Sequence, residues 1–442
     1  MASTVLSRNV SSAGNRKTWT YSVWLKRSGL GADNYFVAQG TDSNNNWTMG
    51  FDNNDVLFMW NYVSGFQIRF TTNRKFRDTN SWYHIMLAVD TTQNTEADRV
   101  KIYVNGVQET SFSVSTYPSQ DFDTIVNSTT GSFYVGNYVQ GSGHYNGCMS
   151  HVHFCDGSAL APTVFGSTDS TTGEWKINTS PSFTPGTNGF TILKDGNTVT
   201  DQSANSNNFT VAGGTLTKTE DCPSNVFATW NRLFPAGGSL NYDAGSTRLY
   251  NTGTAAYRTS VSTLGASTGK FYAEFKCEGD TFFTGVLDIN NTKMGINDTT
   301  FGSSSNMTSY GYGIFNSTGN VSNNGSTVVS GYSSALANGD ILGVALDATN
   351  KKLYFAKNGT WQNSGVPTSG STGTGAISLA SGDRTWVFAS SVNGTNISAN
   401  FGNGYFNETA VSSAGTNASG NGIFEYDVPT GYTALSTKGL NL

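Results

Sequence analysis

The chain has 442 residues, a net charge of −5 and an isoelectric point near 5.4. Only 12% of the residues are charged and no basic run is present, which argues against binding to nucleic acid through its phosphates. The 13% of aromatic residues exclude a disordered chain, and no apolar run approaches the roughly 18 to 20 residues that span a bilayer. With 51 glycines in Asn- and Ser-rich turns, the sequence predicts an all-β protein of two or three domains and almost no helix.

The first half is a series of predicted β-strands. In residues 18–28, every second residue from Trp19 to Leu25 is apolar and shares one face. Further candidates follow at intervals of roughly ten residues: "NYFVAQG", "NWTMGFD", "DVLFMWNY" and "FQIRFTT". Residues 81–92 are apolar at odd and even positions alike, which predicts a strand buried on both faces.

One phrase occurs twice: "VKIYVNG" begins at Val100, and "KKLYFAKNG" begins at Lys351. The second copy has two extra residues before Asn-Gly, and an insertion of two keeps every side chain on its own face of a strand. Asn-Gly is a strong hairpin signal because both residues tolerate positive φ in a type I′ turn. We therefore predict one β-hairpin in each half and one architecture for both halves; a chance match of β-rich sequence is the alternative.

The strand pattern divides the chain into four segments. Residues 1–166 and 241–408 are the two predicted domains. Residues 167–240 contain clusters of turn residues and two short strand candidates, "GFTILKD" and "NNFTVAG", which predict a β-rich connector. Residues 409–442 are predicted to form a C-terminal strand and tail. The expected fold is therefore two antiparallel β-sandwiches joined by a connector.

The four cysteines are predicted to be free thiols. The start of the chain, "MASTVLSRNV", lacks the apolar core of a signal peptide, so we expect synthesis in a cytoplasm, where disulfides are rare. Four cysteines allow two disulfides. However, Cys148 and Cys155 lie seven residues apart in one strand candidate, and this odd spacing predicts opposite faces.

Both halves resemble known domains. The ordered stretches "YSVWLKRS", "SWYHIMLAVDTT", "VKIYVNG", "FYVGN" and "GCMSHVHFCDGSAL" make residues 17–166 similar to laminin-G and concanavalin-A-like lectin domains. The stretches "GKFYAEFK", "SYGYGIF", "GDILGVALDATNKKLYFAKNG" and "ISANFG" make residues 246–406 resemble a SPRY domain. Both resemblances imply a concanavalin-like sandwich of the jelly-roll type.

The pairing of these domains, together with the connector and the ending "YDVPTGYTALSTKGLN", is similar to tail-fibre and appendage proteins of tailed bacteriophages of marine bacteria. The resemblance implies a virion structural protein that is made in the host bacterial cytoplasm and is not inserted in a membrane. Its implied partners are other virion proteins, a bacterial surface glycan and copies of itself, with a homotrimer as the expected state. The expected function is non-enzymatic adhesion; the alternatives are an architectural protein without a ligand and a glycan depolymerase.

Five carboxylates are candidates for chemistry. Glu274 and Glu278 share a predicted strand face, and glycan hydrolysis needs two carboxylates roughly 5 to 10 Å apart; a scaffold role is the alternative. Asp42 in "TDSNNN" and Asp52 and Asp55 in "FDNND" are candidate ligands of Ca²⁺ as a cofactor. Neither loop has EF-hand spacing, and turn formation by Asn and Asp explains both equally well.

Three of the four histidines suggest particular roles. His151 and His153 lie at alternate positions of a predicted strand with Cys155 next along it, a pattern that suits either a zinc ion or a packing surface. His84 is expected to be a buried residue with its hydrogen bonds satisfied.

Sugar binding usually combines aromatic rings, which stack on pyranose rings, with Asn and Asp side chains, which bond to hydroxyls. Loop aromatics next to such residues are the predicted carbohydrate-binding residues, although core or interface packing explains them equally well. They are Trp47, Trp60, Tyr62, Tyr138, Tyr145, Tyr332 and Trp361.

Overall fold

The computed structural model describes residues 3–441 except 140, 195, 197, 235–239, 254–255, 280–281, 292–299 and 302–309. Ser309, the first residue of the "SYGYGIF" stretch, therefore lies outside the described residues. The chain divides into two compact units, Met1–Lys218 and Thr219–Leu442. Apart from strands, the described residues contain short 3-10 turns, so the all-β prediction is confirmed. None of their helices is long and apolar enough to cross a membrane.

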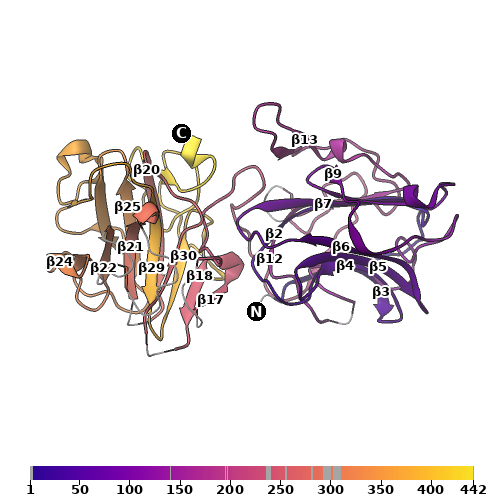
Figure 1. The fold of residues 1–442 in the computed structure, drawn as a ribbon, viewed down its shortest axis with the longest axis horizontal. Helices are drawn as coiled ribbons and strands as arrows, with labels where there is room; N and C mark the ends of the chain where they lie inside the picture. The colour runs from indigo at the N-terminus through magenta and orange to yellow at the C-terminus, as the bar shows by residue number, and fades with distance from the viewer. Residues whose placement is uncertain are drawn as a thin grey trace. The chain divides into compact units, whose positions relative to one another are not determined.

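The first unit is built from two antiparallel sheets, which form separate layers in Figure 1. The eight-stranded sheet has the order β10 (Phe112–Thr116), β6 (Phe66–Lys75), β5 (Val56–Val63), β4 (Asn45–Phe51), β3 (Asn34–Asp42), β11 (Ser132–Val135), β1 (Val5–Asn9) and β16 (Thr210–Gly213). The six-stranded sheet has the order β15 (Phe190–Ile192), β12 (Gly147–Asp156), β2 (Thr18–Arg27), β7 (Trp82–Asp90), β8 (Val100–Val104) and β9 (Val107–Gln108). A small hairpin pairs β13 (Gly166–Thr168) with β14 (Trp175–Ile177).

The core of the first unit lies between these two sheets. Trp19 and Leu25 are fully buried, which confirms the alternation predicted for β2. Across the sandwich, Trp47 of β4 meets Trp19 edge to face with ring centroids 5.4 Å apart. Aromatic pairs of this kind contribute about 0.5 to 1.5 kcal/mol beyond their buried area.

Strand β7 is buried on both faces, as predicted, because a segment of the same unit covers its outer face. We call residues 158–184 the first covering segment; its hairpin β13–β14 lies above β7 in Figure 1. Phe165 packs on Met86, and Trp175 stacks on His84 with ring centroids 5.9 Å apart. A sheet face that would otherwise expose Met86 to water is thereby closed.

The second unit repeats this plan. Its larger sheet contains β17 (Leu240–Asp243), β18 (Arg248–Asn251), β30 (Asn396–Asn400), β20 (Lys270–Cys277), β25 (Ile341–Asp347), β26 (Lys352–Lys357) and β27 (Thr360–Trp361), with β28 (Ile377–Ser378) and β33 (Thr433–Ala434) attached. Its smaller sheet contains β19 (Arg258–Val261), β29 (Trp386–Val392), β21 (Phe282–Asp288), β22 (Gly311–Phe315), β23 (Val321–Asn323) and β24 (Ser326–Val329). The short hairpin β31 (Tyr405–Phe406) and β32 (Thr409–Ala410) follows. Phe275 and Phe388 join the two sheets in the core, with ring centroids 6.0 Å apart.

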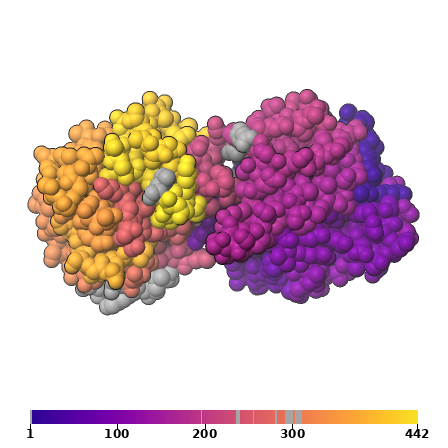
Figure 2. Space-filling view, turned by 90° about the horizontal axis from the view of Figure 1, so that it is seen from above, coloured from indigo at the N-terminus to yellow at the C-terminus, as the bar shows by residue number. Residues whose placement is uncertain are grey.

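Residues 412–434, the second covering segment, close the outer face of β20, β25 and β26. Phe424 and Tyr432, each 1% exposed, pack with Tyr272 of β20 and Tyr354 of β26. Figure 2 shows the C-terminal residues, in yellow, spread over the surface of the second unit. The predicted C-terminal strand and tail is therefore an integral layer of the second unit.

The repeated phrase forms the same hairpin in both units. Asn105 and Asn358 have φ of 50° and 47°, and the glycine that follows each has φ of 77°. Each Asn Oδ1 accepts a 2.8 Å hydrogen bond from the backbone N–H of a neighbouring strand, that of His84 in one unit and Ile341 in the other. The hairpin prediction is confirmed for both copies.

The glycines of both turns support the covering segments. A Cβ on Gly106 would overlap the ring of Trp175, and a Cβ on Gly359 would overlap the ring of Tyr426. In each unit, therefore, an aromatic ring of the covering segment packs directly on the backbone of the Asn-Gly turn.

Residues 167–240, the predicted connector, are divided between the two units. Both predicted strands exist: β15 pairs with β12, and β16 pairs with β1, so both complete sheets of the first unit. The boundary between the units falls at Lys218 and Thr219. The connector is thus made of parts of the sandwiches themselves.

The predicted opposite faces of Cys148 and Cys155 are wrong. A β-bulge between Ser150 and His153 adds one residue to β12 and reverses its alternation. Both cysteines therefore lie on the outer face of the sheet, opposite Lys26 and Thr20 of β2 respectively. Those two partners are six residues apart, about 20 Å along a strand, which is too far for a disulfide. None of the four cysteines forms a disulfide.

Candidate functional site

A row of aromatic rings crosses the outer side of the eight-stranded sheet in the first unit. Leu57 and Met59 of β5 point into the core, so the alternate residues of this strand point outward. We call the row the aromatic face; its members are Tyr35, Phe58, Trp60, Tyr62, Phe66 and Tyr138. The rings form a chain in which each contacts the next at centroid distances of 4.7 to 6.2 Å.

The aromatic face is accessible to a ligand. Phe66 is 43% exposed, and Tyr35, Trp60, Tyr62 and Tyr138 are half-buried. A contiguous, partly exposed aromatic patch of this kind marks an interaction surface more often than scattered single residues do.

Polar groups hold the rings of this face in place. Trp60 Nε1 donates a 2.8 Å hydrogen bond to Asn46 Oδ1, and the Asn46 side chain also bonds to Tyr138. Burial, with smaller contributions from Asp33 and Tyr138, raises the pKa of Tyr35 to about 12. The Tyr35 hydroxyl, like any tyrosine near pH 7, is neutral and both donates and accepts hydrogen bonds, as sugar hydroxyls do.

Of the seven predicted carbohydrate-binding residues, the structure brings together Trp60, Tyr62 and Tyr138 on this face. Trp60 and Tyr62 lie on strand β5, within the strand candidate "DVLFMWNY", and not in a loop. Sequence reasoning missed Tyr35, Phe58 and Phe66. The period-two spacing of Phe58, Trp60 and Tyr62 was a usable signal, because it predicts a single aromatic stripe on a strand.

Of the other four predicted residues, three are buried inside the units. Trp47 is 1% exposed, Tyr145 5% and Tyr332 2%, so the prediction that their rings bind a sugar is wrong. Trp47 occupies an inward position of β4, and the hydroxyl of Tyr332 donates to the Gly375 carbonyl. Trp361 is half-buried against Tyr272 and Tyr354.

The three candidate calcium ligands do not form one site. Asp42 and Asp52 lie at opposite ends of β4, and each accepts backbone N–H groups of its own turn. Asp55 is 4% exposed and bonds to Arg27 and Arg77 at 3.0 Å each. Its carboxylate already neutralises two guanidinium groups, so these residues do not fit a Ca²⁺ ion and we derive no role for one.

The candidate catalytic carboxylates are engaged in the scaffold of the second unit. Glu274 is fully buried and accepts 2.8 Å hydrogen bonds from the backbone N–H groups of Glu425 and Tyr426. Glu278 pairs with Arg248 at 2.8 Å and accepts a hydrogen bond from Ser398. Glu274 therefore links the second covering segment to β20, and Glu278 links the neighbouring strands β18 and β30 to the end of β20.

The histidines of β12 serve packing. His151 lies in the bulge with φ of 49° and Nδ1 2.7 Å from Ser150 Oγ, while His153 Nδ1 is 2.9 Å from Thr191 Oγ1. Phe165 of the first covering segment stacks on His153 with ring centroids 5.4 Å apart. Among the residues described, no group of three or more His, Cys, Asp or Glu side chains is placed to hold a metal ion.

His84 is buried with both ring nitrogens bonded, as predicted. Ser22 Oγ lies 2.9 Å from its Nε2, and Trp175 Nε1 donates to its Nδ1 at 3.1 Å. Stacked rings of Trp24 and Trp175 lie 5.0 and 5.9 Å from it. Burial lowers the pKa of His84 from 6.5 to about 3, so the folded unit holds it neutral.

Acid should therefore destabilise the first unit. Below pH 6.5 the unfolded chain binds a proton at His84 that the folded unit excludes, so the free energy of unfolding falls as pH drops from 6.5 toward 3. At pH 4.5 the expected loss from this residue is about 2 to 3 kcal/mol. Urea unfolding at pH 7.5 and 4.5 measures it. The His84→Gln variant should show a smaller difference; an unchanged difference would contradict this assignment.

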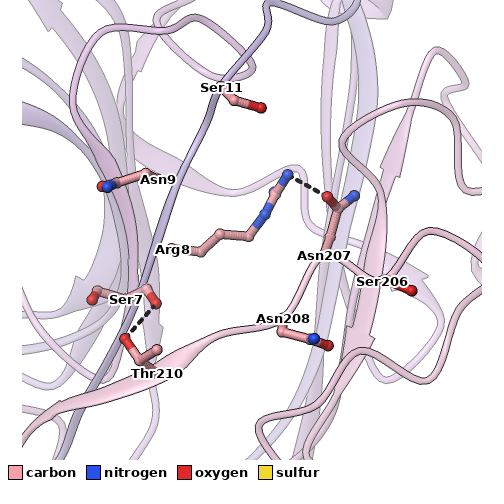
Figure 3. Close-up of a pocket in the computed structure, with 8 residues that line it drawn as sticks. All are labelled: Ser7, Arg8, Asn9, Ser11, Ser206, Asn207, Asn208 and Thr210. Atoms are coloured by element: carbon pink, nitrogen blue, oxygen red, sulfur yellow. Dashed lines mark hydrogen bonds between the residues drawn. The ribbon is translucent and has the colours of Figure 1, made fainter.

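A second, polar site lies at the end of β1 and is drawn in Figure 3. Its volume is about 340 Å³, and it is lined by Ser7, Arg8, Asn9, Ser11, Ser206, Asn207, Asn208 and Thr210. Arg8 donates to Asn207 Oδ1 at 2.6 Å and to the Asn188 side chain at 3.1 Å. These hydrogen bonds connect β1 to two later loops, so Arg8 stabilises the fold of the first unit.

The sequence comparisons identify a domain in the first unit. Residues 3–165 match the concanavalin A-like lectin/glucanases superfamily. The match agrees with the lectin-domain resemblance seen in the sequence of residues 17–166. A search of curated proteins found no match.

Solved structures show distant likenesses. The SPRY domain of human HERC1 is 15% identical over 36% of this chain and 91% of that one, with a TM-score of 0.28. The heptameric SAP-like pentraxin of Limulus polyphemus is 14% identical over 36% and 72%, with a TM-score of 0.27. Domain 4 of AbnA, a GH43 arabinanase of Geobacillus stearothermophilus solved with arabinotriose, is 20% identical over 35% and 67%, with a TM-score of 0.26.

Proposed function

We propose that this chain is a non-enzymatic structural protein of a bacteriophage virion, in a tail fibre, tail or capsid appendage, that binds a glycan of the host surface through the aromatic face. The observation that carries the proposal is this face: Trp60, Tyr62 and Tyr138 lie with three further rings on one accessible sheet surface of a lectin-type domain. Ring faces suit the C–H side of a pyranose, and tyrosine hydroxyls suit its polar edge.

The proposal of adhesion without catalysis is supported by the use of the candidate carboxylates. Glu274 is buried beneath the second covering segment, and Glu278 is paired with Arg248. Neither is placed as an acid or base beside an accessible sugar site. The depolymerase alternative predicts new reducing ends when host envelope polysaccharide is incubated with the protein; release of none is the expected result.

The virion assignment extends the resemblance to phage appendage proteins. We propose synthesis in the host bacterial cytoplasm, assembly with other virion proteins and a homotrimer, so that weak glycan sites act together. Immunogold labelling of purified virions should place the chain on an appendage, and light scattering of the isolated protein should give three times the mass of one chain. Absence from virions would contradict the assignment.

The binding test uses variants of the aromatic face. Trp60→Ala and Phe66→Ala should each weaken binding to host surface polysaccharide about thirtyfold, because a central aromatic contributes about 2 kcal/mol or more to an interface. Val107→Ala is the control, since Val107 is 65% exposed on the other sheet of the same unit. Surface plasmon resonance on immobilised polysaccharide measures the effect.

Two results would exclude glycan binding at this face. Equal affinity of Trp60→Ala and the unaltered protein would remove the face as the site. No binding to any host glycan would favour the architectural alternative, in which the same rings pack against another virion protein.

A further inference from the structure

Arg69 stands at the end of the aromatic face. It lies on β6 directly opposite Trp60 of β5, and its guanidinium lies over the Phe66 ring, 4.4 Å from the centroid. Phe66 and Arg69 are three residues apart, a spacing that would place them on opposite faces of a regular strand. A register shift brings them together, because Asn61 pairs with Ile68 whereas Tyr62 pairs with Phe66, leaving Gln67 extra.

The guanidinium of Arg69 has no protein acceptor. Alone among the arginines of the described chain, it has neither a side-chain hydrogen bond nor an ion pair. The next two arginines along the chain differ: Arg74 pairs with Glu109 at 3.1 Å, and Arg77 pairs with Asp55 at 3.0 Å. Arg69 is also half-buried, so its donors are held at the surface by the ring beneath them.

This arrangement suits an anionic group on a sugar that stacks beside it. A guanidinium presents pairs of parallel N–H donors that match the two oxygens of a carboxylate, and stacking on a ring fixes its plane before the ligand arrives. Trp60, the cross-strand neighbour, offers the ring surface for the same saccharide. We propose that Arg69 binds the carboxylate of an acidic sugar, so that the ligand of the aromatic face is a uronic-acid-containing glycan. This inference rests on the proposed function and names its ligand class.

The test compares acidic glycans with their neutral counterparts. Oligosaccharides of galacturonate, glucuronate and mannuronate are titrated against the full chain, alongside the same oligosaccharides with their carboxyl groups reduced to alcohols. The unaltered protein should bind at least one acidic oligosaccharide about tenfold or more tightly than its reduced form. Arg69→Gln should lose this preference and keep the affinity for the reduced form.

Lys75→Gln is the matched control, because it removes the same charge from the far end of the same strand. Lys75 is exposed and lies away from the aromatic rings, so its variant should keep the preference for the acidic form. Added salt should weaken binding of the acidic form more than binding of the reduced form.

The outcomes separate this inference from the proposed function. Equal binding of acidic and reduced oligosaccharides, both weakened by Trp60→Ala, would overturn the role of Arg69 and leave glycan binding intact. Binding of sulfated dextran without binding of any uronate would overturn the assignment to a carboxylate. Failure of every oligosaccharide to bind would overturn the uronate assignment, and failure of host surface polysaccharide as well would overturn both proposals.

Discussion

Replacing Gly106 with Ala should strongly destabilise the first unit, and replacing Gly359 with Ala should do the same to the second. Both glycines have φ of 77°, a conformation that costs a residue with a Cβ about 1 to 2 kcal/mol. The new methyl group would also overlap Trp175 or Tyr426, and overpacking of this kind costs a further 1 to 3 kcal/mol or so. Urea unfolding, with hydrogen exchange to assign each transition to a unit, measures the total.

Matched controls separate backbone strain from overlap. Gly31 and Gly331 have φ of 71° and 60°, and a Cβ on either would meet no atom within 4 Å. Their Ala variants should therefore lose only the backbone contribution of about 1 to 2 kcal/mol. Adding Trp175→Ala to Gly106→Ala should give a smaller loss than the sum of the single effects. Equal losses for Gly31→Ala and Gly106→Ala would show that the covering segment does not rest on the turn.

Removing the carboxylate of Glu274 should release the second covering segment. Glu274→Ala takes the acceptor from the backbone N–H groups of Glu425 and Tyr426, and each buried donor left without a partner costs about 1 to 3 kcal/mol. We expect a loss of about 3 kcal/mol or more and faster hydrogen exchange throughout residues 412–434. Glu408→Ala, at an exposed position of the same unit, is the control.

The pH dependence gives Glu274 a signature that general destabilisation lacks. Burial raises the pKa of Glu274 from 4.5 to about 7, although four hydrogen-bond donors oppose this rise. Glu274 holds its proton more tightly in the folded unit than in the unfolded chain, so proton binding stabilises the second unit. This contribution to the free energy of unfolding is complete below pH 4.5 and is lost as pH rises through 7. Glu274→Gln should remove this fall in the free energy of unfolding with rising pH. A fall that persists in the variant would contradict the assignment to Glu274.

The strands that the sequence predicts most clearly are those with strict alternation or a known turn. Trp19 to Leu25 alternate because one face of β2 meets the core, and this pattern depends only on positions within one strand. The two Asn-Gly hairpins were predictable for a similar reason, since the turn chemistry is carried by two adjacent residues.

The aromatic face was less predictable from the sequence. Its residues are brought together by irregular strand pairing and by contacts between residues that are far apart in the chain. The register shift of β6 places Phe66 and Arg69 together, and the bulge of β12 moves Cys148 and Cys155 to one face. A single extra residue reverses every later side chain, and the sequence contains no marker for either position. Trp47 was misplaced for a related reason, because whether an aromatic next to Asn faces inward depends on the register of its strand.

By itself, the sequence determined the all-β class, the hairpin that both units share, and the burial of β7 on both faces, because each of these follows from local periodicity and turn residues. Only the tertiary structure decided that residues 158–184 and 412–434 close the outer faces of the sheets, and that Tyr35 and Tyr138 meet on one surface. Those contacts join residues far apart in the chain, and they form because apolar sheet faces must be covered by whichever segment the topology brings to them.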